Sequence, residues 1–146
     1  MDRTNAPGRR MSGLVVLALA LLLMGSGAAA AWTTAYGHLR SRDGVLRPGC
    51  HPHHYHYVVK PGSPDWTLET WLYDPRGRPR GAGDLYADAD PASGRAAFAV
   101  CRPTVVPGRF TITARLRWYT PGQLPTDPPV QHTRWFEPAH FRLSRR

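Results

Sequence analysis

The chain has 146 residues and a formal net charge of +9 at pH 7, and all of its cationic side chains except Lys60 are arginine. Its 15 prolines and 14 glycines leave little room for long helices, which argues against a mainly helical fold. The positive charge is typical of a soluble basic protein or of one that is attracted to anionic surfaces.

The amino terminus has the three parts of a secretory signal. Arg3, Arg9 and Arg10 precede an unbroken apolar run over residues 14–24, and the small residues that follow contain two overlapping A-x-A cleavage patterns. We expect residues 1–31 to be a signal peptide that is removed on export, and residues 32–146 to form a single domain with no membrane span. A retained membrane anchor and the choice between the general and twin-arginine export routes stay open alternatives.

The chain contains two cysteines, Cys50 and Cys101, and both follow the expected signal. In an oxidising compartment an even number of cysteines pairs by default. We therefore predict a Cys50 to Cys101 disulfide, which contributes roughly 4 kcal/mol to stability in the chain-entropy model.

Alternating side chains predict an all-β fold. The clearest strand covers residues 110–119, where Phe110, Ile112, Ala114, Leu116 and Trp118 alternate with polar residues and Tyr119. Weaker alternation predicts strands over residues 55–60, 66–73, 84–87, 95–101 and 133–143, and Pro138 is expected to interrupt the last of these or to confine it to an edge. Turn signals between these segments have a spacing near that of an all-β sandwich or barrel.

One part of the chain resembles bacterial immunoglobulin-like domains. The expected strand "AAFAVC" ends at Cys101 and is followed by "PGRFTITARL", which is similar to the PG-x-[FY]-T pattern that begins a central strand in that family. The layout from Cys50 onward is also similar to that of short secreted proteins of high-G+C Gram-positive bacteria. The resemblance implies an immunoglobulin-like antiparallel β-sandwich of about seven strands, a fold that hosts adhesion, binding, spacer and occasional enzymatic roles. Ala99 stands where the antibody pattern has a tyrosine, so the bridge need not cross between the sheets.

The segment "CHPHHYHYVV", residues 50–59, concentrates four histidines at the start of an expected strand. On a strand His54 and His56 share one face, while Tyr55, Tyr57 and Val59 share the other. The face with the tyrosines and the valine is the better candidate for the core. The two histidines would then lie side by side on the more exposed face.

Two imidazoles in an H-x-H arrangement can bind one zinc or copper(II) ion if further ligands converge on it. A third ligand could come from the histidines before the strand, or from His132 or His140. The candidate metal ligands are His51, His53, His54 and His56. The other interpretation is a solvated strand face or a binding surface without metal, and protonation of these imidazoles near pH 6.5 would make the cluster a pH sensor.

The sequence contains no HExxH or G-x-S-x-G motif, and no spacing selects a pair of carboxylates for catalysis. We therefore expect a secreted binding or surface-interaction module that is not an enzyme and has no cofactor. The alternative is an extracytoplasmic metal-binding protein that holds zinc or copper in the histidine segment. A third class, a protease inhibitor, would present the long proline-rich connection over residues 120–133.

The expected location is outside the cytoplasmic membrane, including the cell wall, with an anionic cell-wall polymer or a surface protein as partner. Nucleic acid is not an expected partner, because the compartment is wrong and the arginines are dispersed along the sequence. The candidate binding residues are the arginines of "PRGRPRG" and two tryptophans expected to be exposed, namely Arg76, Arg78, Arg80, Trp32 and Trp135.

Overall fold

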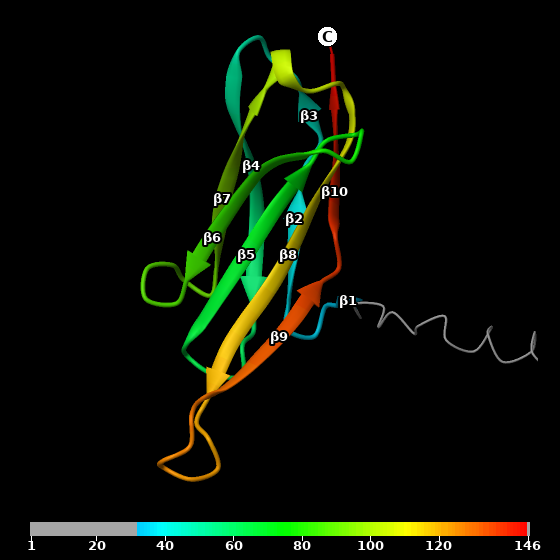
Figure 1. Cartoon of the computed structure of the whole chain (residues 1–146). Helices are drawn as coiled ribbons and strands as arrows, with labels where there is room; N and C mark the ends of the chain where they lie inside the picture. Colours follow the sequence, from blue (N-terminus) through cyan, green and yellow to red (C-terminus); the bar gives the residue numbers. More distant parts are fainter. Residues whose placement is uncertain (1–31, 146) are drawn as a thin grey trace, which may run out of the picture.

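The computed structural model describes residues 32–145, and its strands form two β-sheets that pack face to face (Figure 1). The smaller sheet contains three antiparallel strands in the order β2 (Gly37–Ser41), β4 (Cys50–Val59) and β7 (Ser93–Cys101). The expected signal peptide lies outside the described residues. Within residues 32–145 no helix has the length and the apolar character needed to cross a membrane.

The larger sheet is built around β8 (Gly108–Thr120). One edge of β8 pairs with β5 (Trp66–Tyr73), and β5 pairs in turn with β6 (Pro79–Tyr86). The other edge pairs with two successive strands, β10 (Ala139–Ser144) and β9 (Val130–Phe136). The alternation of side chains in β8 is the most regular in the sequence, and pairing with β5, β9 and β10 fixes the register of this central strand.

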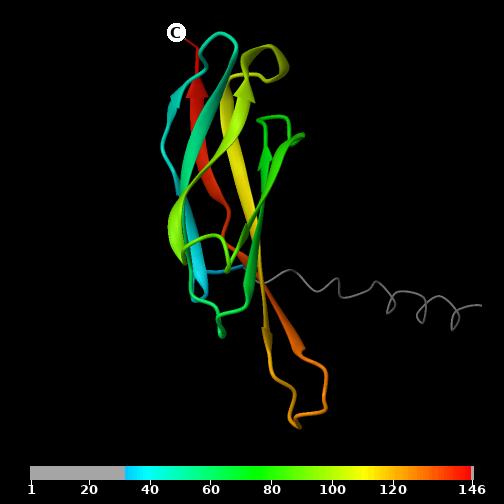
Figure 2. The same ribbon diagram turned by 90° about the vertical axis from the view of Figure 1, so that its left-hand side faces the viewer.

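Three short elements complete the fold. The two-residue strands β1 (Trp32–Thr33) and β3 (Gly44–Val45) pair in parallel with β9 and β10. A single turn of 3-10 helix, η1 (Arg102–Thr104), connects β7 to β8. Figure 2 shows the two layers from the side and the β8–β9 hairpin extending beyond them.

The core lies between the two sheets and follows the alternation of the strands. Every second side chain of β8 is buried, from Phe110 to Trp118, and Leu68 and Leu72 of β5 are completely buried beside them. Tyr55 of β4 faces this layer from the smaller sheet, and its hydroxyl lies 3.0 Å from the buried Thr70 hydroxyl. The pairing of these two hydroxyls keeps both polar groups satisfied inside an apolar core.

The structure confirms the all-β sandwich with a Cys50–Cys101 disulfide. β5 has the predicted bounds, and the last predicted strand is divided at Pro138 into β9 and β10. The described residues contain ten strands rather than about seven, because β1, β2 and β3 are too short or too polar to show alternation. The two parallel pairings also depart from the expected antiparallel pattern.

The disulfide joins neighbouring strands of one sheet. Cys50 and Cys101 lie directly opposite each other in the β4–β7 register, with a Cα–Cα distance of 3.9 Å. The bridge therefore fastens one end of the smaller sheet and does not cross the core. This placement agrees with the departure from the antibody pattern noted at Ala99.

The chain changes sheets between β2 and β3. β2 pairs with β4 only from Gly37 to Ser41, opposite Val59 to Tyr55, and residues 42–47 then cross to β10 of the larger sheet. Residues 50–54 of β4 consequently have β7 as a neighbour on one side and no paired strand on the other. This open edge positions the candidate site.

Candidate functional site

The four histidines of β4 divide between its two faces. His51 and His53 have the same alternation as the buried Tyr55 and Tyr57, whereas His54 and His56 point away from the core and are exposed. The predicted orientation of His54, His56 and the tyrosines is therefore confirmed. His51 and His53 belong to the strand rather than to a loop before it.

His53 is held by packing and by one hydrogen bond. Its ring stacks on Phe141 with 3.9 Å between centroids, and its Nε2 lies 2.9 Å from the Ser41 hydroxyl. Burial lowers the pKa of His53, as does the nearby His54, while Asp43 acts in the opposite direction. The folded protein therefore favours a neutral ring at this position.

The remaining candidate metal ligands point in different directions. The His51 ring donates to the Pro48 carbonyl at 2.7 Å, which holds the turn before β4. His132 stacks on Trp118, and His140 bonds to Thr111 on β8. Within residues 32–145 no three histidine, cysteine or acidic side chains lie close enough together to hold a metal ion.

The four histidines do line one open cleft, with a volume of about 800 Å³. The cleft lies beside the open edge of β4, so side chains from both faces of the strand border it. Residues 42–47 form the opposite wall as they cross between the sheets, and Arg42, Arg47 and Arg95 contribute guanidinium groups. The sequence indicated the histidines but gave no sign of this wall, which depends on the crossing.

Arginines that look dispersed along the sequence gather at one end of the molecule. Arg142 lies directly opposite Arg109, the Arg102 amide donates to Gly49 at 2.9 Å, and Pro75 packs beside Gly108. These contacts bring together the turn after β5, the β7–β8 connection and the end of β10 (Figure 1). We call this region the basic end, and its residues are Arg42, Arg47, Arg76, Arg78, Arg102, Arg109, Arg142 and Arg145.

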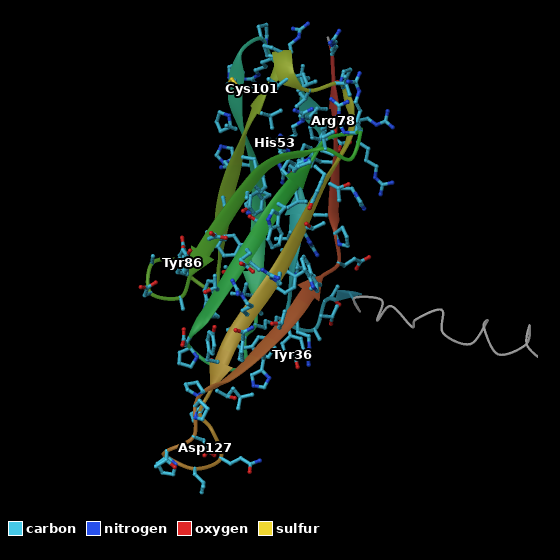
Figure 3. The ribbon with its side chains drawn as sticks, in the orientation of Figure 1. Tyr36, His53, Arg78, Tyr86, Cys101 and Asp127 are labelled. Carbon is cyan, nitrogen blue, oxygen red and sulfur yellow. A yellow bond between two sulfur atoms is a disulfide. The ribbon has the colours of Figure 1, made fainter. Side chains whose placement is uncertain are left out.

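Within residues 32–145 the arginines of the basic end form no ion pair with a carboxylate. The ion pairs of the described chain join Arg80 to Asp74, and Arg115 and Arg117 to Glu69. In Figure 3 Arg78 and His53 lie toward the end that carries Cys101, and Asp127 lies at the other end. A cluster of unpaired guanidinium groups creates a positive potential that attracts anions.

The predicted arginines Arg76, Arg78 and Arg80 have different roles. Asp74 is buried, and its Oδ1 accepts the backbone N–H groups of Arg76 and Arg78 at 2.9 and 3.0 Å. Its Oδ2 accepts the Arg80 Nε at 2.8 Å. Burial alone would raise the pKa of Asp74, but these hydrogen bonds and the Arg80 charge hold it below its usual value. Arg80 therefore supports the turn, while the side chains of Arg76 and Arg78 are exposed.

Trp135 is half-buried on the outer face of the larger sheet. Its ring lies 5.6 Å from that of Trp71, and the Arg115 guanidinium lies 5.4 and 5.5 Å from the two rings. Glu69 accepts hydrogen bonds from Arg115 and Arg117, and the bond from Arg115 holds the pKa of Glu69 below its usual value. The backbone of Trp32 pairs beside Trp135 through β1. The sequence did not reveal this arginine–tryptophan cluster, because its members come from three strands.

The proline-rich connection forms the projecting tip of the β8–β9 hairpin (Figure 2). Leu124 and Val130 are 62% and 48% exposed there. Asp127 braces the tip, because its carboxylate accepts the Leu124 amide at 2.9 Å and its own amide donates back to Leu124 at 3.0 Å. The tip is therefore an ordered turn with an apolar surface.

The cleft offers hydrogen-bond donors and positive charge, which suits binding of an anion. Ser41 Oγ also lies 3.2 Å from the His54 carbonyl, to which it can donate. That bond ties the serine to the backbone of β4 and makes the Ser41–His53 contact part of the packing between β2 and β4.

Comparison with protein-family models, with curated proteins and with solved structures finds no match to this chain.

Proposed function

We propose that the protein is a non-catalytic binding module of the extracytoplasmic space whose basic end binds an anionic polymer of the cell surface. The observation that carries the proposal is the convergence, at one end of the sandwich, of arginines that form no ion pair with any carboxylate of the described residues. Guanidinium groups bind phosphate and carboxylate groups through two parallel hydrogen bonds, so arginine suits this kind of ligand.

The distribution of acidic residues gives the molecule a polarity of charge, with the arginines at one end of the sandwich and aspartates at the other. The connections at the end away from Cys101 carry Asp65, Asp88, Asp90 and Asp127, with Lys60 as a cation among them (Figure 1). An anionic polymer would therefore be attracted to the basic end and repelled by the opposite end. Such polarity favours one orientation of the module on a charged surface.

Two features support the extracytoplasmic location. The disulfide is a bond that persists in oxidising compartments. The sequence before Trp32 has the charged, apolar and small-residue parts of a secretory signal. The cell wall of a bacterium presents phosphate-bearing and carboxylate-bearing polymers in this compartment.

Binding to defined polyanions tests the proposal. The disulfide-bonded protein is titrated with long-chain polyphosphate and with polyglutamate, and the dissociation constant is measured at increasing salt concentration. We expect affinity that weakens steeply with salt, because binding releases counterions from the polymer and added salt reduces the free-energy gain from their release. Failure to bind either polymer at low salt would overturn the proposal.

A charge-matched pair of variants locates the surface. R76Q/R78Q removes two exposed charges from the basic end, and K60Q/R134Q removes two exposed charges elsewhere. We expect the first variant to weaken polymer binding by about tenfold and the second by less than about twofold. Equal weakening by both variants would contradict the assignment to the basic end. Tighter binding of a single-stranded oligonucleotide than of either polymer would replace the cell-surface polymer by nucleic acid.

A further inference from the structure

We infer that the cleft beside the open edge of β4 is a discrete site for a phosphate group. The inference rests on the proposed function and deepens it, because it selects phosphate-bearing polymers among the anionic ones. The residues that carry it are Arg42, Arg47 and Arg95 with His54 and His56.

The cleft is a preformed feature of the fold. Its outer wall, residues 42–47, is fastened to the larger sheet at several points. The Arg142 amide donates to the Asp43 carboxylate at 2.6 Å, the Leu46 amide donates to Ser144 at 2.9 Å, and β3 pairs with β10 between them. Its inner wall, the first half of β4, is fastened to β7 by the Cys50–Cys101 bridge. A ligand therefore meets two walls that are already in place.

The open edge of β4 is poorly suited to binding an added strand. Pro52 lies in the middle of the unpaired segment and has no N–H to donate to a neighbouring strand. The His51 ring is occupied by the Pro48 carbonyl. An extended peptide would therefore lack a regular hydrogen-bond ladder here, and the side chains that border the edge become the ligand-binding groups.

Cationic side chains form a row across the outer face of the smaller sheet. Arg40 of β2 and Arg95 of β7 are the direct neighbours of His56 of β4 on either side. All three are exposed and share one face, and His54 precedes them on the same face. The row leads into the cleft, where Arg42 and Arg47 approach from the opposite wall.

The charge and the number of donors favour phosphate over a carboxylate. Three arginines against Asp43 leave the lining with a positive formal charge even when every imidazole is neutral. Asp43 is turned toward β10 by its bond to the Arg142 amide. A carboxylate has two oxygens and is satisfied by one guanidinium, whereas a phosphate group can accept from several donors that surround it. Guanidinium and imidazole groups on two walls provide such a set.

Tripolyphosphate is a suitable probe, because it is too short to span the basic end. Binding is measured by calorimetry and by the NMR signals of the His54 and His56 rings. We expect one tripolyphosphate per chain, shifts of both ring signals, and weaker binding of acetate and citrate. Binding of sulfate as tight as that of inorganic phosphate would overturn the assignment to phosphate, since the site would then accept any tetrahedral anion.

Matched variants separate the cleft from the rest of the basic end. We expect R42Q/R95Q to weaken tripolyphosphate binding by about tenfold, R42K/R95K to restore part of it, and R76Q/R78Q to change it by less than about twofold. The replaced side chains are exposed, and R95Q alone serves as a second variant if the double variant unfolds. Unchanged binding in R42Q/R95Q, or equal loss in R76Q/R78Q, would overturn the inference.

The outcomes also separate this inference from the proposed function. If long polyphosphate binds through Arg76 and Arg78 but tripolyphosphate leaves the His54 and His56 signals unchanged, the cleft is not a phosphate site and the proposed function stands. If neither polyphosphate nor polyglutamate binds, both proposals fail. If polyglutamate binds as tightly as polyphosphate, the polymer specificity inferred from the cleft is wrong.

Discussion

Cys50 lies directly opposite Cys101 at the end of the β4–β7 pair, and the bond between them closes the part of β4 that has no other neighbouring strand. The disulfide thus holds the inner wall of the cleft as well as the fold. This relationship links the redox state of the protein to its candidate site.

Removal of the disulfide should therefore have a global and a local effect. We expect C50S/C101S to lower the free energy of unfolding by up to roughly 4 kcal/mol, because the unfolded chain loses a long cross-link. Urea denaturation measures this change. In the variant, amide hydrogen exchange should increase most at residues 50–54. An equal increase in exchange along β4 and β8 would contradict the local role of the disulfide.

Asp74 should be a main stabilising residue of the basic end. We expect D74N to destabilise the fold by about 3 kcal/mol, because the change leaves the Arg80 guanidinium without its buried carboxylate partner. Denaturant unfolding measures the loss. D127N is the control, since it changes an exposed carboxylate at the hairpin tip and should cost at most about 1 kcal/mol. Equal effects of the two substitutions would contradict this account of the turn.

Stability should fall on mild acidification because of His53. Burial places its pKa in the folded protein below the value of about 6.5 in the unfolded chain. The unfolded chain therefore binds the proton first, and stability is lost as the pH falls below about 6.5. The pKa of His140 is lowered in the same direction by burial and by Arg109.

Melting temperatures at about pH 8 and about pH 5 measure this effect. We expect H53Q to melt lower than the parent protein at high pH, because it loses the stacking on Phe141, and to show a smaller difference between the two pH values. H140Q is measured in the same way and gives the separate contribution of His140 to the difference between the two pH values. An identical pH dependence in H53Q and the parent protein would show that His53 does not control it.

The metal-binding alternative can be tested by the same measurement of melting temperature. We expect Zn²⁺, Cu²⁺ and EDTA to leave the melting temperature unchanged, because His54 and His56 lie on the opposite face of β4 from His51 and His53. A Zn²⁺-dependent rise that disappears in H54Q/H56Q would instead support a metal site at the H-x-H pair.

The sequence predicted the fold best where a strand has one buried face and one more exposed face. The bounds of β5, the alternation of β8 and the break at Pro138 follow from local patterns that the structure preserves. β2 was not predicted, because "GHLRS" contains one large aliphatic side chain, Leu39, and depends on β4 for its pairing.

The candidate site was only partly predictable. The histidine segment and the Arg76 to Arg80 turn are local in sequence, and both were identified there. The cleft and the basic end depend on where the chain changes sheets and on which loops share one end of the sandwich. Arg42 and Arg95 line one cleft, and Arg142 lies beside Asp43, although these residues are far apart in the sequence, so only the tertiary fold reveals these contacts.

The most direct test of the central claim is the affinity of the disulfide-bonded protein for long-chain polyphosphate, measured for the parent protein and for the variants R76Q/R78Q and K60Q/R134Q. The account predicts salt-sensitive binding that R76Q/R78Q weakens by about tenfold and that K60Q/R134Q leaves nearly unchanged. Absence of binding at low salt, or the same loss in both variants, would contradict it.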